Sequence, residues 1–171
     1  TEEKAVWNSG LITKETPGQS VKLDIDISNA KKLYLVVNDG GDKTDWDHAN
    51  WIEPTLYKGK DSLRLTSLKW TKATSGWQKP KMNQSVSGNV LTLNKIKYEN
   101  GIGTHSNSII EFDIPEGYTR FKAIVGLDEA CVSQNVGATV KFFVFTQKRG
   151  KIIRINTCFA NIKSPHFGTF A

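Results

Sequence analysis

The sequence predicts an all-β fold, an antiparallel β-sandwich of jelly-roll type. Apolar and polar residues alternate from Val21 to Ile27, which is the period of a strand with one solvated face. Short runs rich in β-branched and aromatic residues then recur along the chain, and no segment shows a sustained helical period. At least seven strands at this spacing are typical of a sandwich whose loops gather at its two ends.

Each predicted strand is followed by residues that favour a reversal of the chain. After the strand at 21–27, we expect further strands at 33–37, 51–56, 63–68, 90–93, 109–114, 121–127 and 140–145. Turn sequences rich in Gly, Asn, Asp, Ser or Pro lie between them, at 38–41, 75–76, 87–89, 99–101 and 115–117. This order gives many short strands and no long helix.

The chain length of 171 residues suits one domain, which we place at 1–147, followed by a basic tail at 148–171 that would add an edge strand. The net charge is +6, but the tail holds five of the 23 basic residues and no acid, which leaves 18 basic and 17 acidic residues over 1–147. A near-neutral body argues against a nucleic-acid groove. No apolar run reaches the ~18 residues of a membrane span and no signal peptide opens the chain, so we expect a soluble segment whose targeting signal lies outside it.

The two cysteines, Cys131 and Cys158, have no cysteine or histidine neighbours at metal-site spacing. A disulfide between them and a pair of buried thiols are the two alternatives.

The loop from 38 to 51 carries the densest group of polar side chains in the sequence. The carboxylates of Asp39, Asp42, Asp45 and Asp47 repel one another unless a cation or a hydrogen-bond network holds them. Three interpretations stay open: a solvated turn with Asx hydrogen bonds, direct sugar contact, or a structural calcium ion. We assign Asp39, Asp42 and Asp45 as the calcium ligands.

The same loop holds aromatic and histidine side chains suited to a sugar. His48 is the first candidate, because Asp47 beside it would fix its tautomer and tryptophans flank it. Trp46 is expected to be exposed and to stack on a pyranose face, whereas Trp51 begins a strand and either contacts sugar or belongs to the core. Trp77 follows a glycine in a polar loop and has the same two alternatives.

Two candidates come from later in the chain. His105 opens a strand from a turn of small residues, where its imidazole bonds either to the backbone or to an axial hydroxyl of a sugar such as galactose. Asp128 and Glu129 end a strand and either cap a structural element or contact the ligand; we include Glu129 among the sugar-binding residues.

Nothing in the sequence indicates catalysis. Nucleophile motifs, phosphate-binding glycine loops and zinc spacings are absent. Glu111 and Asp113 stand two apart on a predicted strand and therefore share one face, which we predict to be a solvated sheet surface and not an acid pair across a cleft. We expect a protein that is not an enzyme.

Four segments resemble the NPCBM domain, which is classified as family 51 of the carbohydrate-binding modules. They are the strand Leu68-Lys69-Trp70, the pair Gly76-Trp77, the segment Tyr98 to His105 with its Gly-Ile-Gly-Thr-His run, and the strand Tyr118 to Asp128. The resemblance covers about residues 4 to 146.

The resemblance implies a non-catalytic module linked to the catalytic domain of a secreted glycoside hydrolase. The glycans would carry terminal galactose or N-acetylgalactosamine, as in blood-group A and B determinants, and the module would act outside the cell as a monomer, with no nucleic-acid partner and no membrane insertion. The alternative is a structural or adhesin-like interaction sandwich that binds no sugar.

The order of the family segments departs from the usual one. Residues 1–57 match the C-terminal part of the family pattern and 62–146 its N-terminal part, so we predict a circularly permuted module. The rival account makes 1–57 the remnant of a preceding module and leaves half a sandwich with exposed sheet edges.

Overall fold

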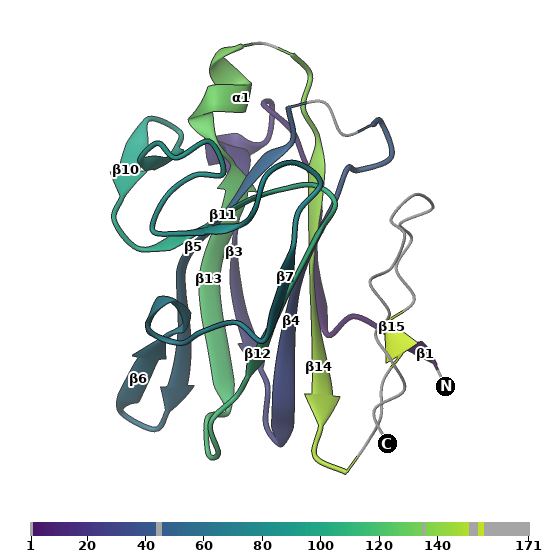
Figure 1. Ribbon diagram of the computed structural model, residues 1–171, viewed down its shortest axis with the longest axis vertical. Helices are drawn as coiled ribbons and strands as arrows, with labels where there is room; N and C mark the ends of the chain where they lie inside the picture. The colour runs from purple at the N-terminus through teal and green to yellow at the C-terminus, as the bar shows by residue number, and fades with distance from the viewer. Residues whose placement is uncertain (1, 44–45, 135, 151–153, 156–171) are drawn as a thin grey trace.

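The computed structural model describes residues 2–43, 46–134, 136–150 and 154–155 and forms a sandwich of two antiparallel sheets (Figure 1). The six-stranded sheet has the order β3 (Ser20–Asp26), β13 (Arg120–Leu127), β5 (His48–Lys58), β11 (Gly101–His105) and β8 (Lys81–Met82), with β6 (Asp61–Arg64) also paired to β5. The five-stranded sheet has the order β2 (Trp7–Ile12), β14 (Val140–Lys148), β4 (Ala30–Asn38), β12 (Ser108–Asp113) and β7 (Lys72–Thr74). The predicted all-β antiparallel sandwich is confirmed.

Four short strands form two smaller pairs. The strands β9 (Leu91–Leu93) and β10 (Ile96–Tyr98) make an antiparallel hairpin, and β1 (Glu2–Glu3) pairs in parallel with β15 (Arg154–Ile155). In the part of the chain that the structure describes, the helical elements are a helix α1 (Glu129–Ser133) and the 3-10 turns Pro17–Gln19 and Leu65–Ser67. Among the described residues, no helix is long and apolar enough to cross a membrane.

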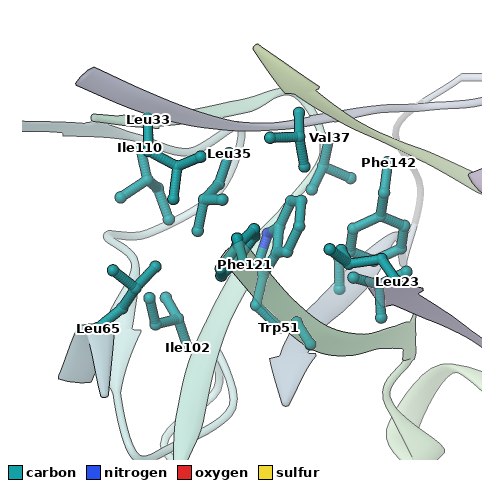
Figure 2. Close-up of a cluster of buried hydrophobic side chains, with 14 of the residues drawn as sticks. Leu23, Leu33, Leu35, Val37, Trp51, Leu65, Ile102, Ile110, Phe121 and Phe142 are labelled. Carbon is teal, nitrogen blue, oxygen red and sulfur yellow. The ribbon is translucent and has the colours of Figure 1, made fainter. Parts of the chain in front are cut away.

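The core between the sheets follows from the alternation of side chains along the strands. On β4, Leu33, Leu35 and Val37 face the core, while Tyr34 and Val36 belong to a separate cluster on the other face. Figure 2 shows side chains of both sheets meeting around the indole of Trp51. Burial of this apolar surface is the main stabilising contribution to the fold.

The central strand β5 is buried on both of its faces. Trp51 packs in the inter-sheet core, and the next residue, Ile52, packs on the opposite face against Leu91 and Leu93 of the β9–β10 hairpin. The hairpin therefore acts as a partial third layer over the six-stranded sheet. This layer also brings the loops around β9 and β10 next to the end of the sandwich that carries α1 (Figure 1).

Several details differ from the sequence-based expectation. The residues that lead to His105 form the strand β11, which ends at His105, and not a turn that opens a strand. The predicted strand at 63–68 ends at Arg64, and a 3-10 turn continues it because Leu65 turns into the core with 0 % exposure. Glu111 was predicted to lie on a solvated surface, but it is only 1 % exposed, because β12 lies between β4 and β7. Its carboxylate accepts a hydrogen bond from the Thr71 hydroxyl and lies 3.5 Å from Lys32 Nζ. The helix α1 was not predicted; its first turn is capped by Asp128, which accepts a hydrogen bond from Ala130 N.

Strands from a first segment (residues 1–57) and a second segment (residues 62–146) are interleaved in both sheets, except that the neighbours β11 and β8, and β12 and β7, all come from the second segment. The strand β5, from the first segment, lies between β13 and β11 of the second, and β4 lies between β14 and β12. The segments meet at the β5–β6 hairpin, at the end of the sandwich opposite to α1 (Figure 1). In the tail, β15 is the described strand; residues 151–153 and 156–171, and with them Cys158, lie outside the described residues.

Candidate functional site

The candidate site lies where β5 begins and β11 ends, next to α1 (Figure 1). The two strands are antiparallel neighbours, and their register sets His48 directly opposite His105. Side chains of directly opposed residues share one face of a sheet and lie within contact distance. Strand pairing between residues 57 positions apart therefore brings the two imidazoles together.

Two tryptophans complete a cluster of four rings. The ring of His48 stacks with Trp46 at a centroid distance of 5.9 Å and with Trp77 at 5.4 Å, both with an interplanar angle of 20°. His105 meets His48 edge-on at 5.5 Å and Trp77 at 6.1 Å. The histidines are buried, whereas Trp46 and Trp77 are 46 % and 45 % exposed. We call these four residues the ring cluster.

The ring cluster lines an open pocket of about 600 Å³. This volume falls within the range of about 300 to 1,000 Å³ typical of small-molecule sites. The residues that line it are Trp46, His48, Gly76, Trp77, Ser87, Asn89, His105 and Ala130. Half-exposed indoles beside polar hydrogen-bonding groups give the pocket both apolar faces and directional contacts.

The loop that carries Trp77 is fastened to the end of β11. The Ser75 hydroxyl accepts a hydrogen bond from His105 N at 3.1 Å, and Gly76 N donates to His105 O at 3.3 Å. A Cβ on Gly76 would lie 2.0 Å from Ser106 O, so only glycine permits this approach of the two backbones. Trp77 is thus held on a rigid support although it lies in a loop.

Hydrogen bonds hold the ring of His105 and the backbone of His48. Among the described residues, His48 Nδ1 is buried without a hydrogen-bond partner and the Asp47 carboxyl group bonds to Ser106 and Thr139, so the prediction that Asp47 fixes the tautomer of His48 is wrong. His105 Nδ1 lies 2.6 Å from the carbonyl oxygen of Ser106, which can only accept, so Nδ1 carries the proton and Nε2 is the acceptor of the ring. The backbone of His48 is anchored to the α1 region, since its N–H donates to Cys131 Sγ and its carbonyl accepts from Asp128 N. Burial and the neighbouring His105 lower the pKa of His48, so its imidazole is neutral at pH 7.

Asp47 holds three segments together beneath the ring cluster. It is 0 % exposed, and its carboxyl group accepts hydrogen bonds from the Ser106 hydroxyl at 2.7 Å and from Thr139 N at 3.2 Å. Burial raises the pKa of Asp47 to about 8, and the nearby carboxylates of Asp42 and Asp39 add to the increase, against the two hydrogen bonds. Its role is to position the loop that precedes His48; it does not line the pocket.

The raised pKa of Asp47 predicts a stability that falls as the pH rises. The folded chain keeps the proton up to about pH 8, whereas the unfolded chain releases it near the ordinary value of 3.8, so folding is linked to proton uptake between these values. His48 acts in the opposite direction only below its ordinary value of 6.5. Between pH 6.5 and about 8, the melting temperature in EDTA should therefore decrease.

Asp47→Asn is the matched variant for this prediction, because the amide can accept from Thr139 N and donate to the Ser106 hydroxyl without titrating. Its melting temperature should show a flatter pH dependence over the same range. An identical slope in the two proteins would mean that Asp47 is ionised in the folded state.

The structure separates the sequence-predicted sugar-binding residues into two groups. It brings Trp46, His48, Trp77 and His105 together at one pocket. Trp51 is instead 0 % exposed in the core, which corrects its inclusion among the sugar-contacting residues; its indole packs edge-on against Phe142 at 5.0 Å. Neither Asp47 nor Glu129 lines the pocket; the Glu129 carboxylate accepts a hydrogen bond from Lys95 N at 3.0 Å.

The carboxylates assigned to calcium form no complete ligand set within the described residues. Asp39 Oδ1 accepts a hydrogen bond from Gly41 N at 2.9 Å, which is an Asx turn, and Asp42 is exposed. Asp45 lies outside the described part of the loop. No group of three or more His, Cys, Asp or Glu residues suited to a metal occurs in the described ranges.

Four residues that line the pocket were not among the predicted site residues: Gly76, Ser87, Asn89 and Ala130. Residues 75–76 and 87–89 were predicted as turns, but a turn sequence does not show which part of the folded domain the turn will contact. Ala130 has no polar group and reaches the pocket only because α1 lies against the start of β5. The sequence alone contains no pattern that would have singled it out.

The protein is an antiparallel sandwich with tryptophan and histidine rings around an open pocket at one end. This arrangement is typical of β-sandwich modules that bind a ligand noncovalently. The chain belongs to the NPCBM/NEW2 domain family, whose model matches residues 1–57 and 61–155. This is a family of carbohydrate-binding modules. No curated protein and no solved structure matches the chain.

Proposed function

We propose that this domain is a non-catalytic carbohydrate-binding module of the family 51 type that binds a terminal galactose or N-acetylgalactosamine residue at the ring cluster. The observation that carries the proposal is the stacking of the buried His48 with two half-exposed tryptophans over an open pocket of about 600 Å³. Membership of the NPCBM/NEW2 family supports it.

The chemistry of the pocket suits a pyranose. The apolar face of a sugar ring packs on an indole, which offers a large, rigid contact area at a low entropic cost. The hydroxyl groups then need fixed partners, which His105 Nε2 as an acceptor and the amide of Asn89 can supply. Galactose and N-acetylgalactosamine carry an axial 4-hydroxyl, and a fixed imidazole discriminates against the epimer because the wrong one leaves a buried polar group unpaired.

The pocket lies at one end of the sandwich and is open to solvent, so it suits the terminal residue of a glycan chain. Blood-group A and B determinants end in N-acetylgalactosamine and galactose and are therefore the glycans we propose. One stacking contact and a few hydrogen bonds correspond to a dissociation constant of about 10 to 1000 μM. Such a module would hold a linked, secreted glycoside hydrolase at a glycan surface, where neighbouring modules add avidity.

A glycan array tests this function. We expect binding to glycans that end in galactose or N-acetylgalactosamine, and a saturable response to the corresponding monosaccharides in calorimetry. A chain that serves only as a structural or adhesin-like spacer would give no saturable response to any sugar, and that result would overturn the proposal.

Calcium in the loop 39–47 remains a prediction from the sequence. A cation bound only by the folded state would stabilise the domain by mass action, so EDTA should lower its melting temperature by a few degrees and added calcium should restore it. Asp42→Asn should abolish this response, while Asp113→Asn, also exposed but far along the chain on β12, should leave it intact. An unchanged melting temperature in EDTA would remove calcium from the account.

We also propose that the module is circularly permuted. In support, strands of both segments are interleaved in each sheet, and the segments are joined by the tight β5–β6 hairpin. The strand β1 also pairs with β15, so the two ends of the described chain lie side by side. Limited proteolysis with mass spectrometry should release no independently folded fragment. Cleavage near Gly59 that leaves a stable 62–147 fragment would contradict the permutation.

A further inference from the structure

A second hollow adjoins the ring-cluster pocket. It has a volume of about 300 Å³, and Asn89 lines both it and the pocket. Its walls come from the turn after β8 and from the end of β10, and they present the carboxamides of Asn83 and Gln84, the ring of Tyr98 and the carboxylate of Glu99. The hollow therefore meets the pocket at Asn89 and is lined by hydrogen-bonding groups, one aromatic ring and the exposed side chain of Val90.

The shared wall is a rigid turn. Ser85 is 0 % exposed, and its hydroxyl accepts a hydrogen bond from Asn89 N at 3.1 Å and lies 3.1 Å from the hydroxyl of Ser87. Ser85 N donates to Asn89 O at 2.9 Å, and Asn89 Nδ2 lies 3.3 Å from Ser87 Oγ. Because these bonds exist before any ligand arrives, placing the Asn89 amide between two bound groups costs little ordering entropy.

The strand β11 also supports this turn, which follows β8. A Cβ on Gly103 would lie 2.3 Å from Gln84 O, so β11 and the turn are in close backbone contact. Asn83 N donates a hydrogen bond to Gly101 O at 2.7 Å, and the side-chain Oδ1 of Asn83 accepts one from Gly101 N at 3.2 Å. β11 also ends at His105, so one strand supports both the ring cluster and the second hollow.

Tyr98 is the aromatic residue that lines the hollow. It is half-buried and packs against the cluster of Ile52, Leu91 and Leu93 beneath the β9–β10 hairpin. The ring is therefore anchored by the hairpin while it also lines the hollow. A fixed tyrosine next to carboxamides and a carboxylate offers what a second pyranose needs: an apolar face and hydrogen-bond partners for its hydroxyls.

We propose that this hollow is a second sugar subsite, which binds the residue next to the terminal one and makes Asn89 the bridge between them. The inference rests on the proposed function of the ring cluster and names a more specific ligand for it: the end of an oligosaccharide, not a single sugar. The carboxylate of Glu99 favours a neutral or N-acetylated second residue and disfavours an acidic one, because like charges repel.

Calorimetry on the full chain with matched ligands tests this subsite. The probes are the methyl glycosides of galactose and N-acetylgalactosamine, and the disaccharides lactose, N-acetyllactosamine and lacto-N-biose. The disaccharides present galactose on a second residue that differs either in its identity, glucose or N-acetylglucosamine, or in its linkage. At least one disaccharide should bind about tenfold more tightly than methyl galactoside, which corresponds to one or two net hydrogen bonds. Tyr98→Ala and Glu99→Gln should each reduce this gain and leave the monosaccharide affinity unchanged.

Tyr98→Ala can lower the melting temperature, because Tyr98 is half-buried. In that case Glu99→Gln still tests the subsite, since Glu99 is exposed and its substitution does not disturb the fold. Lys97→Ala, on the same strand and also exposed, is the matched control and should behave like the unmodified chain. Monosaccharide binding without any gain from a disaccharide, or a gain that both variants retain, would overturn the second subsite alone. Failure of every sugar to bind would overturn the proposed function and this inference with it.

Discussion

Replacing His48 with alanine is expected to reduce galactoside binding below detection while the domain stays folded. The ring of His48 stacks with both exposed tryptophans and meets His105 edge-on. Its removal therefore takes away the stacking partner of Trp46 and the ring that links the tryptophans to His105. The hydrogen bonds that fix β5 to α1 use the backbone of residue 48 and are retained. Calorimetry gives the binding, and thermal unfolding of the same sample gives the stability.

Asp61→Ala is a suitable control, because Asp61 is exposed on β6 at the opposite end of the sandwich and should leave binding unchanged. A His48→Ala protein that binds galactosides as the unmodified chain does would exclude the ring cluster as the site. Parallel loss of binding and of folded structure would make His48 a structural residue.

Replacing Trp51 with alanine is expected to destabilise the domain by about 3–5 kcal/mol, the range for truncating a large aromatic side chain in a core. Trp51 is 0 % exposed and lies among side chains of both sheets, so truncation leaves a cavity that neither sheet can close (Figure 2). Chemical denaturation measures the loss as a lower midpoint with an unchanged slope.

Trp77→Ala is the matched tryptophan variant. Its indole is 45 % exposed, so the free energy of unfolding should change by less than about 1 kcal/mol, whereas binding should weaken strongly. The two variants thus separate the tryptophan of the core from the tryptophan of the site. The reverse pattern, with a stable Trp51→Ala protein, would contradict the assignment of Trp51 to the core.

The sandwich could be predicted because alternation of side chains is a local property. The run from Val21 to Ile27 and the strand at 33–37 carry their pattern within a few residues, and both form strands. Whether the second face of a strand is also buried depends on segments that are distant in the sequence. Trp51 and Ile52 are both buried because β5 is covered on one side by the other sheet and on the other by the β9–β10 hairpin, so no alternation distinguished core from site there.

The candidate site could be predicted only in part for the same reason. His48, Trp46, Trp77 and His105 have side chains whose chemistry attracts attention wherever they occur in the sequence. Asn89 is an ordinary turn residue by its sequence. It lines the pocket because strand pairing places its turn against β11, a contact between distant segments that no local pattern encodes.

The central claim is that the ring cluster holds a sugar, and the tryptophan indole N–H resonances test it most directly. The chain has five tryptophans, which can be assigned by single substitutions to phenylalanine and followed by NMR during titration with methyl galactoside. We predict saturable shifts for Trp46 and Trp77 with one common dissociation constant, and none for the buried Trp51. Shifts that spare Trp46 and Trp77, or no shift with either methyl galactoside or methyl N-acetylgalactosaminide, would contradict the claim.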